Sequence, residues 1–139
     1  MTKETLSVVV ACHGGRPPAA AFHRRLTAAV NAVGMPWHIL YVGDPGASGA
    51  VPAEASSDTR VELVPVSAGS SRQEAVAAGL RRATGSAVAI IDADPIAPPE
   101  VIGPLVDRWR EGCDVAYGRP MPGDGDSAAG WGGRVRQSL

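Results

Sequence analysis

The sequence predicts an α/β fold: a mainly parallel sheet of about five strands with helices on both faces, in three layers. Two observations carry this prediction. Short runs rich in β-branched residues alternate along the chain with longer helix-forming segments. The runs end at Gly, Pro or Asp, which favour turns. With 139 residues and a mass of 14.2 kDa, the chain has the length of one domain.

The strands are expected where the apolar runs are short and β-branched. Pro65 places the third of them near an edge of the sheet. The fourth is the most apolar of the set. The five expected strands are residues 6–12, 37–42, 61–66, 86–91 and 113–117.

Three helices are expected between these strands, because each intervening segment has a helix start signal and a stop signal. The first opens at Pro17-Pro18 and ends before Gly34. The second is capped by Ser70 or Ser71, and Glu74 completes a capping box with Ser71. The third opens at residues 98–100 and ends at Gly112.

The last part of the chain has a different composition. Pro, Gly and Asp crowd residues 120–133, and little in this stretch can build a core. We therefore expect a domain over residues 1–118, followed by an irregular or mobile extension over 119–139 that ends in the start of a helix.

Composition excludes several classes of protein. The 13 Lys and Arg residues against 14 Asp and Glu residues give a net charge of −1, which argues against a nucleic-acid binder. No apolar run is long enough to cross a bilayer, and no secretory leader is visible. Cys12 and Cys113 are far apart in sequence and lie in expected strands, so we interpret them as reduced thiols. These features predict a cytoplasmic protein without a transmembrane segment.

The candidate site lies at the carboxyl ends of the expected strands, where ligands collect in parallel sheets. His13 follows the first strand, Asp44 follows the second, and Asp92-Ala93-Asp94 follows the fourth. Parallel strands present these ends at one edge of the sheet. The sequence therefore predicts that these side chains share one rim.

Asp92 and Asp94 are the sharpest chemical feature of the sequence. Two carboxylates one residue apart, after a very apolar strand, suit a hard divalent cation such as Mg²⁺ or Mn²⁺. Such a cation would neutralise a diphosphate while its bond to a donor group breaks. The alternative is structural: Asp92 braces the turn, and Asp94 fixes the loop before Pro95.

The other rim residues each have a functional and a structural interpretation. Asp44 suits hydrogen bonds from a nucleobase or ribose, or an Asx-turn with Pro45-Gly46. Arg72, in the first turn of a helix, suits a phosphate contact or a solvated position. His13 could stack on a base. No Cys or His partners stand at zinc spacing.

The order of these residues resembles the nucleotide-sugar-binding half of family 2 glycosyltransferases, most of all the polyprenyl-phosphate (dolichyl-phosphate) mannosyl- and glucosyltransferases. The resemblance covers nearly the whole chain, and its most specific part is the stretch from Ile91-Asp-Ala-Asp94 to Pro98-Pro-Glu100. The other matching segments are Leu6–Val10, Tyr41–Gly46, Ala75 to Gly85, Glu111 to Arg119, and Gly130 to Ser138.

The resemblance implies a GT-A, Rossmann-like fold and a nucleoside-diphosphate sugar as donor. It implies that Val42 and Asp44 face the nucleoside, and that Asp92 and Ala93 meet the ribose and phosphate. Ala11 and His13 are further candidates for contact with the substrate, although the family usually has other residues at these positions. Asp94, with Asp92, would hold the metal. Arg119 would approach the diphosphate or the sugar. Arg72 stays a candidate for substrate contact through its place in the helix. The resemblance also implies inverting transfer to a polyprenyl phosphate or another acceptor, by a protein peripheral to the membrane; no catalytic residue is singled out.

The sequence also departs from the family pattern. Gly43 stands in place of the first aspartate of a paired motif, and Ile96 in place of a polar residue near the metal. The chain ends where such enzymes continue into acceptor-binding segments. Two alternatives therefore stay open: a second copy or a partner chain supplies the acceptor half, or the chain is a catalytically inactive binding or scaffold module. A different α/β nucleotide enzyme, such as a nucleotidyltransferase, is a further alternative.

Overall fold

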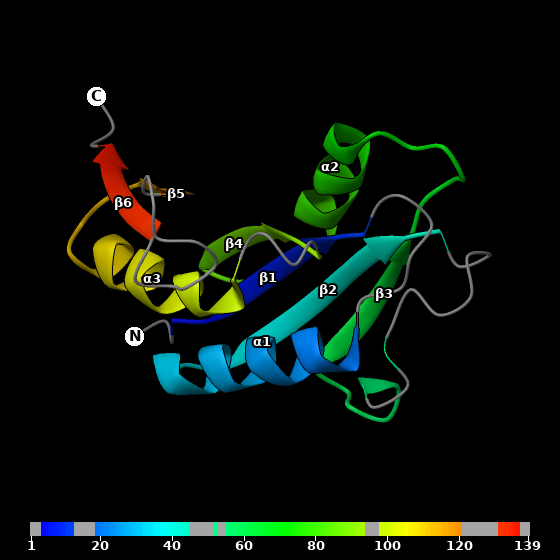
Figure 1. Ribbon diagram of the computed structural model, residues 1–139, viewed down its shortest axis with the longest axis horizontal. Coiled ribbons are helices and arrows are strands. Elements are labelled where there is room, and N and C mark those ends of the chain that lie inside the picture. Colours follow the sequence, from blue (N-terminus) through cyan, green and yellow to red (C-terminus); the bar gives the residue numbers. More distant parts are fainter. Residues whose placement is uncertain are drawn as a thin grey trace.

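The computed structural model describes residues 4–12, 19–44, 52, 55–93, 98–120 and 131–136, with the side chains of 118–120 and 131–136 left out. Strands and helices alternate along the chain, as the sequence predicts (Figure 1). The elements are β1 (Leu6–Ala11), α1 (Ala20–Val33), β2 (Trp37–Gly43), β3 (Val61–Pro65), α2 (Arg72–Arg82), β4 (Ala87–Asp92), the 3₁₀ turn η2 (Pro99–Val101), α3 (Ile102–Arg110), β5 (Val115–Pro120) and β6 (Trp131–Arg136).

The main sheet has four parallel strands in the order β3-β2-β1-β4. Helices α1 and α3 cover one face and α2 covers the other, so the expected three-layer α/β, Rossmann-like fold is confirmed (Figure 1). β1 lies in the middle, and all six of its residues are buried. β3 lies at an edge, as Pro65 predicts.

Alternate residues of β1 point into two separate cores, which is the pattern of a strand covered on both faces. Leu6, Val8 and Val10 pack with α1 and α3. Val9 and Ala11 pack beneath α2 with residues of β2. Arg72, the first residue of α2, therefore belongs to the helix on the face of the sheet to which Val9 and Ala11 point.

The ends of the helices follow the predicted signals. Ser71 caps α2, because its Oγ accepts a hydrogen bond from the backbone N–H of Glu74 at 3.1 Å. Gly34 ends α1 with a φ of 79°, a left-handed conformation that glycine adopts without strain. The described part of the first helix begins at Ala20, and Pro17 and Pro18 lie outside the described residues.

The fifth strand departs from the prediction. β5 forms a separate antiparallel pair with β6 instead of extending the four-stranded sheet. β5 also runs to Pro120, across the domain boundary expected at residue 118. Pairing with a strand so close along the chain closes a short loop, which carries a small entropic penalty.

The end of the chain also differs from the prediction. Residues 131–136 form the strand β6, where we expected an irregular segment leading into a helix. Gly132 and Gly133 disfavour a helix, and the backbone of β5 offers hydrogen-bonding groups to an extended segment. None of the helices in the described ranges has the length and apolarity that a membrane crossing requires.

Helix α2 packs unusually close to the sheet. A Cβ atom added at Gly79 would lie 2.4 Å from a methyl carbon of Val9 and 3.0 Å from one of Val42. Only glycine allows this approach, because any larger side chain would push the helix away from β1 and β2. Gly79 therefore sets the height of α2 above the sheet.

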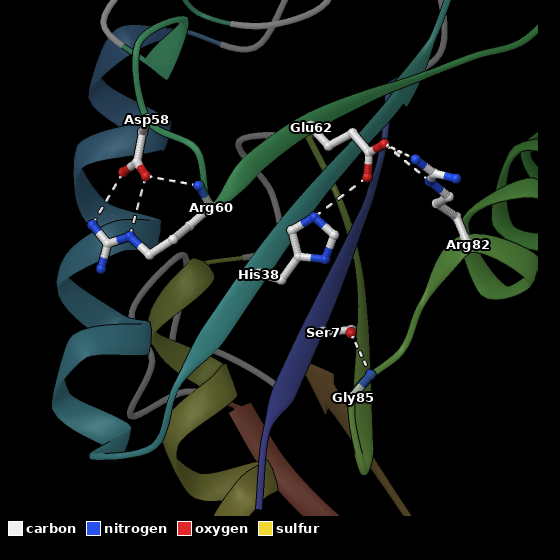
Figure 2. Close-up of polar contacts among 7 residues, drawn as sticks. All are labelled: Ser7, His38, Asp58, Arg60, Glu62, Arg82 and Gly85. Carbon is white, nitrogen blue, oxygen red and sulfur yellow. Dashed lines mark hydrogen bonds and ion pairs between the residues drawn. The ribbon is translucent and has the colours of Figure 1, made fainter.

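Charged pairs and hydrogen bonds hold the far end of α2 and the segment that follows it (Figure 2). Nε of Arg82 donates to Glu62 Oε1 on β3 at 2.9 Å, and His38 Nε2 on β2 lies 3.4 Å from the other oxygen of Glu62. The backbone N–H of Gly85 donates to the buried hydroxyl of Ser7 at 2.8 Å. The Arg82–Glu62 pair thus anchors the end of α2 to β3, and the Gly85–Ser7 hydrogen bond anchors the segment after α2 to β1.

We predict different effects for the substitutions Gly79→Ala and Gly103→Ala. Gly79→Ala should lower the free energy of unfolding by about 1–3 kcal/mol, because the new methyl group overpacks the contact with Val9. Gly103→Ala in α3 should change it by less than about 1 kcal/mol: the new Cβ meets no atom within 4 Å beyond its chain neighbours and its own helix backbone, and the helix propensity of alanine is opposed by the restriction that Pro104 places on the preceding residue. Urea denaturation of both variants measures the difference. Equal effects would contradict the proposed role of Gly79.

A second prediction concerns Glu62, whose pKa is lowered, mainly by its hydrogen bond from Arg82. A lowered folded-state pKa stabilises the fold at pH values above the ordinary glutamate pKa of 4.5, and this contribution disappears as the pH falls through the folded-state pKa. Glu62→Gln should therefore flatten the loss of stability below pH 4.5. The effect should not exceed about 1 kcal/mol, because the pair is partly exposed.

The measurement is denaturant unfolding at several pH values between 3 and 6. Arg82→Gln is the matched variant: it removes the main cause of the shift and should flatten the same part of the curve. An unchanged pH profile in both variants would exclude this source of acid sensitivity.

Candidate functional site

The carboxyl ends of three strands meet at one edge of the sheet. In the parallel register, Ala11 of β1 stands between Val42 of β2 and Asp92 of β4. Backbone hydrogen bonds between the strands continue past the strand ends. The N–H of Cys12 donates to the carbonyl of Val42 at 2.8 Å, and the N–H of Ala93 donates to the carbonyl of Ala11 at 3.0 Å. The predicted rim is therefore a continuous, hydrogen-bonded edge.

Ala11 and Val42 form the floor of this rim. Their side chains are 1% and 0% exposed and lie under α2. The covered side chains support the strand ends that form the rim. The sequence alone does not show which side chains at the strand ends are buried under a helix and which are exposed at the rim.

Asp92 is the acidic side chain that the structure places most clearly at the rim. It ends β4, and its carboxylate accepts a hydrogen bond from Nε of Arg72, with 2.7 Å between Nε and Oδ1. The side chain of Arg72 is 50% exposed and that of Asp92 is 27% exposed. The sequence indicates both residues separately; their ion pair appears only in the fold.

Asp44 lies at the same edge, directly after β2, and is partly exposed. β1 separates β2 from β4, so the strand ends at Val42 and Asp92 are about 10 Å apart at ordinary strand spacing. A nucleotide is long enough to contact both.

The remaining site predictions lie partly outside the described residues. His13 and Asp94 are among the residues that are not described, and Arg119 lies on β5 with its side chain left out. Ala93 directly follows β4 and packs against the core on the α1 side. Asp44, Arg72, Asp92 and Ala93 are thus the described residues that the fold brings to or beside the rim.

The described residues contain no cluster of three or more His, Cys, Asp or Glu side chains that could hold a metal ion. The Asp92 carboxylate has the oxygen chemistry that Mg²⁺ and Mn²⁺ prefer, and the cationic group against it is Arg72. The Asp92 carboxylate thus already holds one cationic group, the Arg72 guanidinium, at the place where a metal ion would bind.

Two further polar side chains near the rim belong to the core. Tyr41 is fully buried, and its hydroxyl lies 2.6 Å from Nδ1 of the buried His23. Burial raises the pKa of Tyr41, and the nearby Cys12 adds to the shift. A tyrosine in an apolar strand needs such a partner for its hydroxyl, but the sequence does not say which residue supplies it.

An open groove of about 650 Å³ runs along the outer edge of β4. Arg72 and Val76 of α2 line one side, and residues of α3 and β5 line the other. Val88 and Ile90 of β4 are 39% and 40% exposed, so the most apolar strand of the sequence has one uncovered face. The groove includes Arg72 but not Asp44 or Asp92, so it adjoins the rim without containing it.

The sequence matches the family model of glycosyl transferase family 2 over residues 7–137. The chain belongs to glycosyltransferase family 2. The match includes all four strands of the parallel sheet and the rim with Asp44, Arg72 and Asp92. The resemblance noted in the sequence is thereby confirmed.

Several family 2 relatives are similar to this chain. An uncharacterised glycosyltransferase of Synechocystis is 44% identical over 61 residues, which are 44% of this chain and 19% of the relative. The uncharacterised glycosyltransferase YkcC of Bacillus subtilis is 40% identical over 60 residues, or 43% of this chain and 19% of the relative.

A longer match is to the undecaprenyl-phosphate 4-deoxy-4-formamido-L-arabinose transferase of Pectobacterium carotovorum. It is 31% identical over 116 residues, which are 81% of this chain and 36% of the relative. The chain thus spans about a fifth to a third of the length of these family 2 relatives.

Cys12 provides a prediction for the rim. Its thiol is partly buried at the end of β1, and burial raises its pKa to about 12. Because the thiolate is the reactive form, Cys12 should react with iodoacetamide at pH 8 far more slowly than a free cysteine. Peptide mass spectrometry of folded and urea-unfolded protein measures both rates. Equal rates in the two states would show that Cys12 is exposed and open to catalysis.

Proposed function

We propose that this domain binds a nucleoside-diphosphate sugar at the carboxyl rim of its sheet and presents the sugar for transfer. The observation that carries the proposal is the convergence of β1, β2 and β4 at one edge, with the Asp92–Arg72 pair directly at the end of β4. Family 2 membership supports a nucleotide-sugar donor over other nucleotides. A nucleotidyltransferase is therefore the weaker candidate.

Each rim residue has a proposed role. Asp44 accepts hydrogen bonds from the nucleoside, and Asp92 with Ala93 meets the ribose and the phosphates. Ala11 and Val42 support the nucleotide from below, because their side chains are buried. His13, Asp94 and Arg119 complete the site as nucleoside, metal and phosphate contacts, respectively.

The proposed cofactor is Mg²⁺ or Mn²⁺, held by Asp94 and Asp92. The cation supplies charge neutralisation for the diphosphate when it is bound. The chain's own residues orient the donor through the contacts at the rim. Positioning of the donor and neutralisation of the charge on the leaving diphosphate are the main contributions of such a site.

The proposed reaction is an inverting displacement at the anomeric carbon. An acceptor oxygen forms a bond to this carbon while the bond from carbon to the diphosphate oxygen breaks, and the electron pair leaves with the nucleoside diphosphate. The name of the Pectobacterium relative suggests a polyprenyl phosphate as acceptor. The phosphate oxygen of such an acceptor is already anionic, so a protein base is less necessary than for a sugar hydroxyl.

The acceptor and its location are part of the proposal. A lipid phosphate acceptor implies that the domain works at the cytoplasmic surface of a membrane, as a peripheral protein. Because this chain spans at most about a third of the relatives compared, we propose that acceptor binding needs a further segment, a second copy or a partner chain.

The test is calorimetric titration of UDP-glucose and GDP-mannose, with Mn²⁺ and with EDTA. Asp44→Asn and Asp92→Asn should each weaken binding of the preferred donor about tenfold, or about 1.4 kcal/mol, because each removes a charged hydrogen-bond acceptor from the nucleotide. Asp107→Asn, on the exposed side of α3, is the matched control and should bind normally.

A product assay with the preferred donor and a short-chain polyprenyl phosphate separates binding from transfer. Sugar transfer by the isolated chain would refute the inactive-module alternative. Donor binding without transfer would support a binding module or a domain that needs its acceptor half. No binding of any nucleotide sugar by the wild-type chain would refute the proposal.

A further inference from the structure

We infer that Arg72 is an exchangeable counter-charge of the donor site: it holds the Asp92 carboxylate while no donor is bound, and it turns to the donor diphosphate when the nucleotide sugar binds. The inference rests on the proposed nucleotide-sugar site and adds the residue that switches between its two states. It follows from the contact, exposure and anchoring of Arg72.

The contact uses only part of the guanidinium. Nε of Arg72 donates to Asp92 Oδ1 at 2.7 Å. The two terminal nitrogens of Arg72 make no hydrogen bond to any of the described residues. Arginine carries five N–H donors in a planar fork, so four of them have no acceptor within the described part of the chain and can face a second anion. A diphosphate oxygen is the kind of anion that this fork binds in a bidentate manner.

Because the Arg72–Asp92 pair is partly exposed to water, breaking it costs little free energy. The side chain of Arg72 is half exposed, while that of Asp92 is 27% exposed. An ion pair open to water contributes little net stability, because water screens it and holding both side chains in place opposes it. The present contact uses one N–H and one carboxylate oxygen, whereas a doubly charged diphosphate offers more negative charge and a bidentate contact, which favours the move of the guanidinium.

The anchoring of α2 lets the side chain move without the helix. Arg72 is the first residue of α2, and the helix is held by the Ser71 cap, the close packing of Gly79 and the Arg82–Glu62 pair. None of these contacts includes Arg72. The exchange therefore needs only rotations of one long side chain.

Two consequences separate this role from a structural one. Without Arg72, a nucleoside diphosphate loses a cationic partner and should bind more weakly. A divalent cation at Asp92 loses a competitor for the carboxylate and should bind more tightly. A salt bridge that only stabilises the fold would leave the nucleotide affinity unchanged, so this affinity decides between the two roles.

The test compares wild type, Arg72→Gln, Arg72→Lys and Arg82→Gln. UDP and GDP are titrated by calorimetry in EDTA, and Mn²⁺ is titrated without nucleotide by electron paramagnetic resonance. Arg72→Gln should bind the preferred nucleoside diphosphate about tenfold more weakly and Mn²⁺ several-fold more tightly. Arg72→Lys should recover part of the nucleotide affinity, since it keeps the charge.

Arg82→Gln is the matched control, because it removes an exposed ion pair at the other end of the same helix (Figure 2). It should leave both affinities at wild-type values. Unchanged nucleotide affinity in Arg72→Gln, with normal binding by wild type, would overturn the inference alone. Absence of nucleotide binding in wild type would refute the proposed function and the inference with it.

Discussion

The close contact between α2 and the central strands is the constraint on which the candidate site depends. Gly79 has no side chain, so the helix can lie directly on Val9 and Val42. At this height, the first residue of the helix reaches the end of β4, and Arg72 meets Asp92. A helix held farther from the sheet would carry Arg72 out of reach. The packing of one glycine thus links the apolar core to the charge arrangement at the rim.

The rim combines rigid and movable parts. Its floor consists of buried residues of β1 and β2 whose backbone groups are hydrogen-bonded across the sheet. Above this floor stand partly exposed charged side chains on separate strands and on α2. A rigid floor fixes where a ligand lies, and side chains with access to water can exchange partners as charge arrives. This division suits a site that binds and releases a highly charged nucleotide.

The uncovered face of β4 contrasts with the rest of the sheet. β1 is buried on both faces, but Val88 and Ile90 of β4 remain substantially exposed because α2 lies over β1 and β2. Apolar side chains on an edge strand favour association with other segments. The chain spans at most about a third of the length of the relatives named above.

Local patterns were sufficient for the parallel sheet and its helices. The apolar runs predicted β1 to β4, Ser71 predicted the start of α2, and Pro65 predicted the edge position of β3. The same patterns gave the wrong pairing for β5, since a run of residues specifies a strand but not its neighbour. They also missed β6, because the many Gly, Pro and Asp residues before it suggested an irregular segment.

For the site, the sequence by itself determined which charged residues follow which strands, and therefore that Asp44 and Asp92 share an edge of the sheet. This follows from chain direction alone, since parallel strands end on the same side. Only the tertiary structure decided that Arg72 faces Asp92, that Ala11 and Val42 are covered, and that Tyr41 meets His23. Those contacts join residues on different elements, and the distance between two elements depends on how side chains such as Val9 pack against Gly79.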